Sequence, residues 1–142
     1  MTNFTARLTI AAATLVVAAG SASAQVLKAE IPFTFRAGSV VLAAGTYQVS
    51  ADHKNGQPMY RLWSETDHKS ILLVAGAARD PQQAWVANGH PVLSFECGVS
   101  HCALAGIWAG SETPAYTFPR HKLGRDEPTR TAVVLMRPGK GE

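Results

Sequence analysis

Short strand-like stretches between frequent turn signals limit most strongly how this chain can fold. Stretches of alternating or continuous apolar residues recur between Gly, Asn, Asp and Pro clusters, with turn signals about every 8–12 positions. No amphipathic helical pattern of about 10–15 residues stands between them. This spacing is typical of antiparallel all-β domains. We therefore predict an all-β fold, a single compact antiparallel meander that closes as a sandwich or as a small barrel.

The clearest strand pattern covers residues 27–35, LKAEIPFTF. Apolar residues occupy every second position and so share one face of the predicted strand: Leu27, Ala29, Ile31, Phe33 and Phe35. Pro32 cannot donate a backbone hydrogen bond, which places it at a sheet edge or at a bend. We expect residues 27–35 to form an exposed sheet edge.

The later strands are predicted from apolar runs and from the turn residues between them. Asn-Gly pairs favour tight hairpin turns because both residues tolerate positive φ. The expected elements are a hairpin at 46–64 that turns at Asn55-Gly56, a strand over 71–78, a second hairpin that turns at Asn88-Gly89 between Trp85-Val86 and residues 92–95, a hairpin made of strands on either side of 98–101, a short helical turn near 120–126, and a closing strand at 131–138.

The first 24 residues have the pattern of a secretory signal peptide. Arg7 precedes an apolar run over 8–19, and Ala22-Ser23-Ala24 supplies a small-residue cleavage site before Gln25. The run is well short of the roughly 20 residues that a membrane-spanning helix needs. We expect an exported protein, periplasmic or extracellular, in which residues 25–142 form a single β domain with no stable membrane anchor.

The charge of this expected mature domain is low. Loss of Arg7 with the leader leaves 12 basic and 10 acidic side chains, a net charge of +2. The basic residues are scattered, with acidic residues between them, and form no run of Lys and Arg. Nucleic acid is therefore not an expected partner.

The only two cysteines, Cys97 and Cys102, are separated by four residues within ECGVSHC. A hairpin turning over 98–101 would place them opposite each other, within the Cα separation that a disulfide accepts. A redox pair or a covalent haem site would require C-x-x-C spacing. Zinc could take both cysteines and His101, but the fourth ligand is missing because the other histidines stand singly in predicted turns. We predict a disulfide, no metal site and no cofactor.

No catalytic motif stands out in the chain. The sequence contains no G-x-S-x-G, no glycine-rich phosphate loop and no H-E-x-x-H. The neighbouring residues Ser100, His101 and Cys102 would point in different directions, and a disulfide would remove the thiol. We predict that the protein is not an enzyme; a hydrolase with dispersed catalytic residues is the remaining enzymatic alternative.

Four aromatic residues are candidates for a ligand site. Tyr47, Trp63, Trp85 and Trp108 could line a groove for a glycan or an apolar molecule, since each combines a large apolar body with a polar group. The competing interpretation is ordinary core packing. Trp63 stands out because it falls on the strand face opposite Tyr60 and Leu62.

Two segments resemble a family of small exported all-β proteins of uncharacterised function that is common in acidobacteria. AEIPFTFRAGSVVLAAGTYQV at 29–49 is similar to the family pattern I-P-F-x-F followed by L-P-A-G-x-Y-x-V, with Ala43 where the family usually has proline. VLSFECGVSHCALAGIWAG at 92–110 is similar to its second hairpin, with Cys97 and Cys102 at positions usually held by ordinary strand residues. The resemblance implies an exported, mostly β domain and supplies no catalytic residue or cofactor.

Two functions follow as hypotheses. The first is an exported non-enzymatic β domain that acts in the cell envelope or outside the cell by binding or assembly. Its partner would be an envelope protein or a second copy of the chain, held at the sheet edge formed by 27–35. The alternative is a carrier of a small apolar ligand or a glycan that uses the four aromatic residues.

Overall fold

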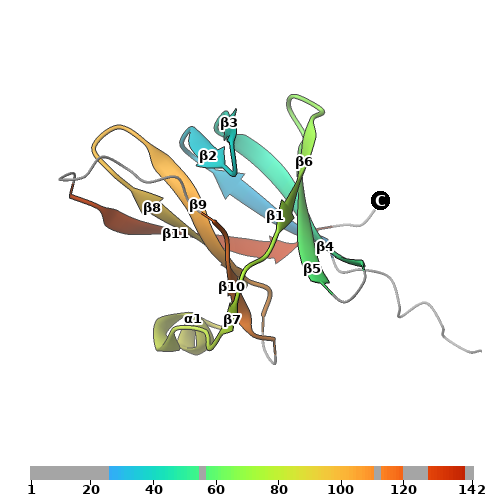
Figure 1. Cartoon of the computed structure of the whole chain (residues 1–142), viewed down its shortest axis with the longest axis vertical. Coiled ribbons are helices and arrows are strands. Elements are labelled where there is room, and N and C mark those ends of the chain that lie inside the picture. Colours follow the sequence, from blue (N-terminus) through green and yellow to red (C-terminus); the bar gives the residue numbers. More distant parts are fainter. Residues whose placement is uncertain (1–25, 55–56, 111–112, 120–127, 140–142) are drawn as a thin grey trace, which may run out of the picture.

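The computed structural model describes residues 26–54, 57–110, 113–119 and 128–139. These residues form an eleven-stranded sheet and one short helix, which confirms the all-β prediction (Figure 1). In chain order the elements are β1 (Val26–Ile31), β2 (Phe35–Ala37), β3 (Val40–Leu42), β4 (Gly45–Lys54), β5 (Gln57–Ser64), β6 (Ser70–Val74), β7 (Ala78–Arg79), α1 (Gln83–Asn88), β8 (Val92–Cys97), β9 (Cys102–Trp108), β10 (Ala115–Thr117) and β11 (Arg130–Pro138).

The sheet curls into a half-barrel. Its strand order is β3-β2-β9-β8-β11-β1-β4-β5-β6, and β10 pairs with both β9 and β7 beside this path. All of these pairings are antiparallel except that of β2 with β9. The two ends of the sheet approach each other, because a methyl group on Gly38, in the β2–β3 turn, would lie 3.5 Å from Leu73 Cδ2 in β6. No backbone ladder joins β3 to β6 among the described strands. The half-barrel therefore keeps an open seam between these two strands.

The core lies inside the curl and is built from the alternating residues of the strands. Leu27, Ala29 and Ile31 of β1 are buried, as the alternation predicts. Phe35 packs edge-on against Tyr47 and Phe95, with ring centroids 5.4 Å apart in both pairs. Edge-to-face pairs are a favourable arrangement for aromatic rings. This aromatic group joins β2, β4 and β8 across the interior.

The prediction that residues 27–35 form a sheet edge is wrong. β1 pairs with β4 on one side and with β11 on the other, so it lies in the middle of the sheet. Pro32 lies in the break between β1 and β2, where its missing N–H interrupts no ladder. The proline therefore marks a bend, and the main path of described strands ends at β3 and at β6.

The prediction of a hairpin turning at Asn88-Gly89 is also wrong. Residues 83–88 form α1, and Gly89 caps it in the left-handed region, with φ +83°. The Gly89 N–H donates to the Trp85 carbonyl oxygen at 3.0 Å. A glycine with positive φ serves a helix end as readily as a hairpin turn, and the apolar contacts of Trp85 favour the helix.

The other predicted hairpins and strands are present, except that the strand predicted over 71–78 ends at Val74 and β7 begins only at Ala78. β4 pairs with β5 from Tyr47↔Ser64 to Lys54↔Gln57, β6 occupies the apolar run after residue 69, and β11 lies between β8 and β1. The predicted turn at Asn55-Gly56, the helical turn near 120–126 and the signal peptide over 1–24 lie outside the described residues.

Candidate functional site

The two cysteines form the predicted disulfide at the end of the β8–β9 hairpin. Cys97 and Cys102 are paired directly across the ladder, with Cα atoms 3.9 Å apart. Beyond them, the Gly98 N–H donates to the His101 carbonyl oxygen at 2.7 Å and closes the tip. Cys97 is buried in the core, whereas Val99 at the tip is 78% exposed. The bond therefore ties an exposed tip to the core.

In the described ranges, no group of three or more His, Cys, Asp and Glu side chains is placed to hold a metal ion. His101 is exposed beside the disulfide. Over those ranges the structure contains no helix whose length and apolar character would suit a membrane crossing.

Tyr47 and Trp63 lie apart from each other and from the other two predicted ligand-site aromatics. Tyr47 is 1% exposed, and its hydroxyl donates to the Ala43 carbonyl oxygen at 2.5 Å. Burial, reinforced by the Asp67 carboxylate, raises the pKa of Tyr47. Trp63 is half-buried on the outer face of β5, where its ring lies 5.6 Å from that of His68. Tyr47 thus belongs to the core, and Trp63 to the outside of the half-barrel.

Trp85 and Trp108 meet in a second, smaller core. They pack with Val92 and Ala115 where α1 covers the outer face of β8 and β9. The Trp108 Nε1–H donates to the Thr113 carbonyl oxygen at 3.0 Å. Of the four aromatic candidates, the structure brings only Trp85 and Trp108 together, and Trp85 also borders an open groove.

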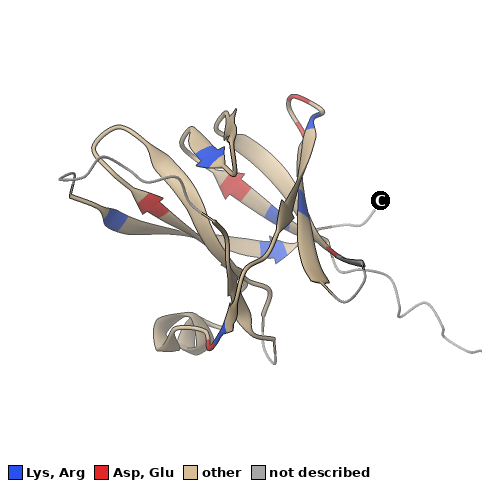
Figure 2. Cartoon of the chain, viewed as in Figure 1, with Lys and Arg blue, Asp and Glu red and all other residues tan. Residues whose placement is uncertain are grey.

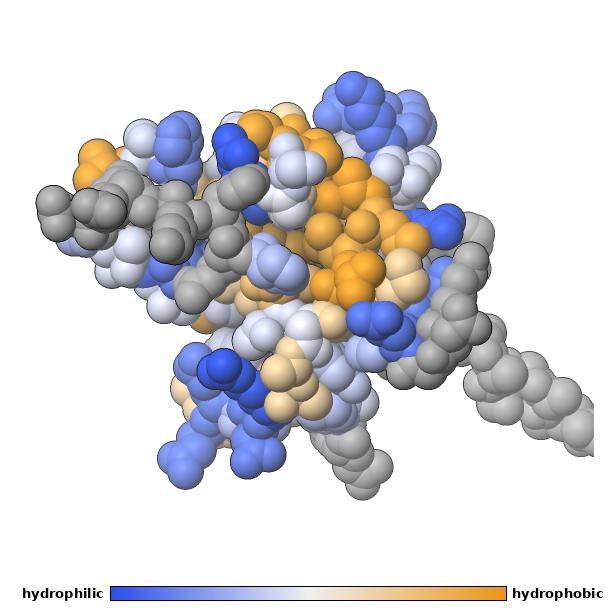
Figure 3. Space-filling view, in the orientation of Figure 1, coloured by the Kyte–Doolittle hydropathy of each residue, from blue (hydrophilic) through white to orange (hydrophobic). Residues whose placement is uncertain are grey.

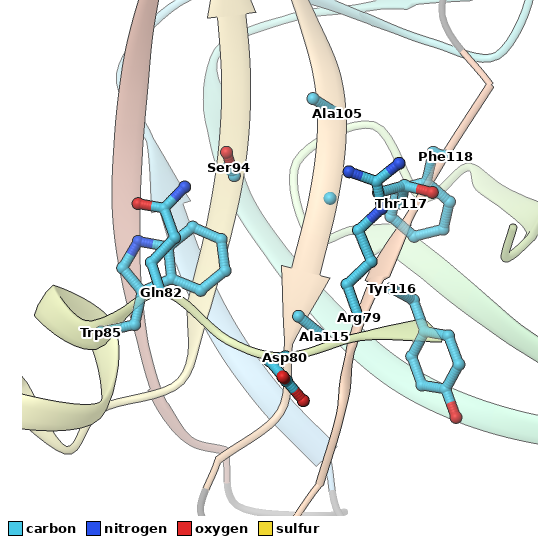
Figure 4. Close-up of a pocket in the computed structure, with 11 residues that line it drawn as sticks. Arg79, Asp80, Gln82, Trp85, Ser94, Ala105, Ala115, Tyr116, Thr117 and Phe118 are labelled. Atoms are coloured by element: carbon cyan, nitrogen blue, oxygen red, sulfur yellow. The ribbon is translucent and has the colours of Figure 1, made fainter. Parts of the chain in front are cut away.

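This groove lies between α1 and β10, with β8 and β9 behind it (Figure 4). Its volume of about 490 Å³ falls within the range of about 300–1,000 Å³ that is usual for small-molecule sites. Figure 4 shows Gln82 and Trp85 on one side, Arg79 and Thr117 on the other. The complete lining consists of Arg79, Asp80, Gln82, Trp85, Ser94, Ala105, Gly106, Ala115, Tyr116, Thr117 and Phe118.

Gly106 lets β10, one side of the groove, lie close beside β9. Gly106 is paired with Thr117 of β10, and a Cβ at Gly106 would lie 2.9 Å from the Tyr116 carbonyl oxygen. The β8–β9 register also shifts between Ser94 and Phe95. Such irregularities re-aim side chains and are frequent beside binding sites. Here Ser94, although 92% buried, turns its hydroxyl toward the groove (Figure 4).

Four polar side chains of the groove have no partner among the described residues. None of Arg79, Asp80, Gln82 and Ser94 has a side-chain hydrogen bond or an ion pair to another described residue. Sequence reasoning missed all four. The polar run RDPQQ before Trp85 is a signal for the first three, but Ser94 reads as an ordinary strand residue.

A second candidate surface follows the open edge of β6. Leu72 and Val74 are 43% and 45% exposed, and Val40 and Val41 of β3 are 42% and 57% exposed. Figure 3 shows apolar surface over β6 and over β3 on the same face of the molecule. We call these four residues the seam patch, because they flank the opening between the two ends of the sheet.

Among the described residues, the backbone of β6 has no strand partner on its outer side. Ala75 N–H donates to the Pro58 carbonyl oxygen, and Ser64 N–H donates to the Lys69 carbonyl oxygen. Hydrogen-bonded pairs alternate along an antiparallel ladder, so the backbone groups of Ser70, Leu72 and Val74 face away from β5. These groups are available to a further strand.

With the fold and both surfaces established, comparisons with protein-family models, with curated proteins and with solved structures each found no match to this chain.

Proposed function

We propose that this protein is an exported, non-enzymatic β domain that acts by binding a partner protein, and that the partner adds an extended segment to the open edge of β6. The single observation that carries the proposal is this edge, which combines unpaired backbone groups with the exposed apolar side chains of Leu72 and Val74. Strand addition satisfies the backbone and covers the side chains in one step.

The edge lacks the features that usually prevent strand addition. Proteins protect exposed edges with charged residues, prolines, bulges or covering loops. β6 has the sequence SILLV, with no charge and no proline, and its ladder with β5 is regular. An edge of this kind suits recognition of another strand.

Charge around the seam patch favours a partner segment with acidic residues. Arg61 is paired with Leu72 across β5 and β6, Arg36 is paired with Val41 across β2 and β3, and Lys69 directly precedes β6. Figure 2 shows basic residues on β2 and β5 at either side of this region. None of the three is in an ion pair with another described residue. A second copy would bring the same positive charges, so a foreign segment with apolar and acidic residues fits better.

Export rests on the leader pattern over 1–24 and is supported by the disulfide. Structural disulfides persist in oxidising compartments such as the periplasm or the extracellular space. Under this proposal the domain works in the envelope or outside the cell. Expression of the full chain followed by mass spectrometry of the envelope fraction tests it: cleavage before Gln25 is expected, and an intact leader in the cytosol would contradict export.

Strand addition is testable with two peptides and amide NMR. We expect a peptide of about six alternating Val and Glu residues to protect the Leu72 and Val74 amide protons from exchange, because these amides gain a carbonyl partner. A peptide of alternating Val and Lys should bind more weakly, since Arg61 and Lys69 repel it. Unchanged Leu72 and Val74 amides with the acidic peptide would reject the proposal.

Val74→Glu and Val133→Glu form a matched pair of variants for the same measurement. Both valines are 45% exposed, but Val133 lies in β11, away from the β6 edge, and is paired with Ser94 of β8. Val74→Glu should abolish protection by the acidic peptide, and Val133→Glu should leave it intact. If the purified chain instead dimerises with concentration through the same amides, the occupant is a second copy, and the acidic partner is wrong.

A further inference from the structure

We infer that the groove between α1 and β10 binds a neutral sugar ring of a short glycan. This inference is independent of strand addition, because the groove is formed by β7, α1, β8, β9 and β10 and contains no residue of the seam patch. Three features of the groove support it: the polar groups that converge there, the space between them and their charge.

The polar groups supply both donors and acceptors. Arg79 offers guanidinium N–H donors, and Asp80 offers carboxylate oxygens as acceptors. The amide of Gln82 offers both N–H donors and an acceptor oxygen. These side chains have no described partner that would have to be displaced. Sugar hydroxyls both donate and accept, so they can pair with all three groups.

Ser94 adds a directed hydroxyl at the back of the groove. Ser94 as a whole residue is 92% buried, but no side-chain oxygen or nitrogen of the described residues is both buried and unpaired, so the Ser94 hydroxyl is open to the groove that it lines. Its hydroxyl has no protein partner among the described residues and faces the groove (Figure 4). It is therefore suited to pair with a ligand hydroxyl at the deepest point.

The apolar part of the lining suits the C–H face of a sugar. Trp85 forms one wall, and Ala105 and Gly106 present almost no side chain behind the centre of the groove. In Figure 4, Ala105 lies between Trp85 on one side of the groove and Arg79 on the other. A pyranose ring can lie there with its C–H groups toward Trp85 and its hydroxyls toward Arg79 and Ser94.

Charge selects a neutral ring over an acidic one. Arg79 and Asp80 are adjacent in the chain and both line the groove, so their charges oppose each other within one site. A uronic acid carboxylate would gain from Arg79 but would be repelled by Asp80. A neutral hydroxyl pair can bridge the two side chains without that cost.

The test uses the purified chain and a defined set of oligosaccharides followed by two-dimensional NMR. Cellotriose, maltotriose and N,N′,N″-triacetylchitotriose are titrated to about 10 mM, ten times the Kd of a millimolar complex. At least one should give saturable shifts of the Gln82, Ser94 and Gly106 amides. The absence of saturable shifts with all three, or tighter binding of trigalacturonic acid, would overturn the inference.

Matched variants then locate the site. Gln82→Ala and Ser94→Ala should each weaken binding of the responding trisaccharide about 3–10-fold, the loss expected for one hydrogen bond. Gln57→Ala removes an exposed glutamine on β5, outside the groove, and should not change the Kd. Gln82 is exposed, so its variant should fold normally. Unchanged affinity in Gln82→Ala and Ser94→Ala would overturn the inference.

Discussion

The Cys97–Cys102 bond acts on a very short loop, and its effect on stability is correspondingly local. The chain-entropy model gives about 2 kcal/mol for so short a loop. We expect reduction with TCEP to lower the free energy of unfolding by about this amount and leave the domain folded. Urea unfolding with and without TCEP measures the change, and exchange should accelerate more at Gly98 than at Leu104, where it should follow global stability alone. Global unfolding on reduction would contradict this expectation.

Tyr60 links stability to alkaline pH. Burial, reinforced by neighbouring Tyr116, raises the pKa of Tyr60 to about 12 from its ordinary value of 10.0. Between these values the unfolded chain releases the phenolic proton and the folded chain keeps it, so the free energy of unfolding falls as pH rises. Above pH 12 the free energy of unfolding is lower by about 2–3 kcal/mol, and below pH 10 it is unaffected by this group.

Tyr60→Phe tests this linkage because it removes only the hydroxyl. Urea unfolding at several pH values from 8 to 12 should give a shallower decline for the variant than for the native chain. Equal slopes would show that Tyr60 does not contribute.

At the residue scale, the sequence predicts those features that depend on the spacing of residues along the chain. Alternation identifies the buried positions from Leu27 to Phe35, and the four-residue gap identifies the disulfide. Spacing along the chain carries no information about which distant side chains meet. Arg79 and Ser94 line the same groove only because β7, β8, β9 and β10 assemble around it.

At the element scale, the attachment of β10 depends on Gly106. The backbone of β10 lies so close to β9 that a Cβ at Gly106 would lie 2.9 Å from the Tyr116 carbonyl oxygen. We expect Gly106→Ala to lower the free energy of unfolding by about 1–3 kcal/mol, the usual cost of overpacking. Urea unfolding measures this loss.

The same variant should also loosen a specific hydrogen bond. The Phe118 N–H donates to the Ala105 carbonyl oxygen at 2.9 Å, next to Gly106. Its amide exchange should accelerate in Gly106→Ala, while exchange at Leu62 in β5 should follow global stability alone. Unchanged stability and exchange would mean that β10 shifts without cost.

The two wrong predictions about elements have a common cause: a glycine or a proline is compatible with more than one local structure. Gly89 has the positive φ expected of a glycine in a hairpin turn, but it ends a helix. Pro32 cannot donate a ladder hydrogen bond, which suits a sheet edge, but it lies in the bend between β1 and β2. In both cases tertiary contacts decide: Trp85 packs on Val92 and Trp108, and β11 occupies the free side of β1. Neither contact is visible in the local sequence.

At the scale of the whole molecule, β11 joins the two parts of the sheet. It pairs with β8 on one side and with β1 on the other, and it buries Val134 and Met136 in the core. We expect removal of residues 130–142 to prevent folding, because two strands would lose a neighbour at once. A well-dispersed NMR spectrum of the shortened chain would contradict this; removal of 140–142 alone is the control.

The way in which the sheet closes cannot be predicted from sequence periodicity. Alternation indicates which residues face inward, but it cannot tell a sandwich from a barrel. The half-barrel depends on the bend at Pro32, which lets β1 pair with β4 and β11 while β2 pairs with β3 and β9. Only the folded arrangement shows that the seam patch lies between the ends of the sheet.

The pairing of β1 with β11 also sets the order in which the protein can be completed during synthesis. The Glu30 and Arg137 side chains, which meet at 3.1 Å across these strands, are 107 positions apart in the chain. β1 emerges from the ribosome early and has no partner on this side until β11 follows. The sheet therefore cannot close on the growing chain, and β1 must wait for almost the whole domain to be synthesised before its second ladder forms.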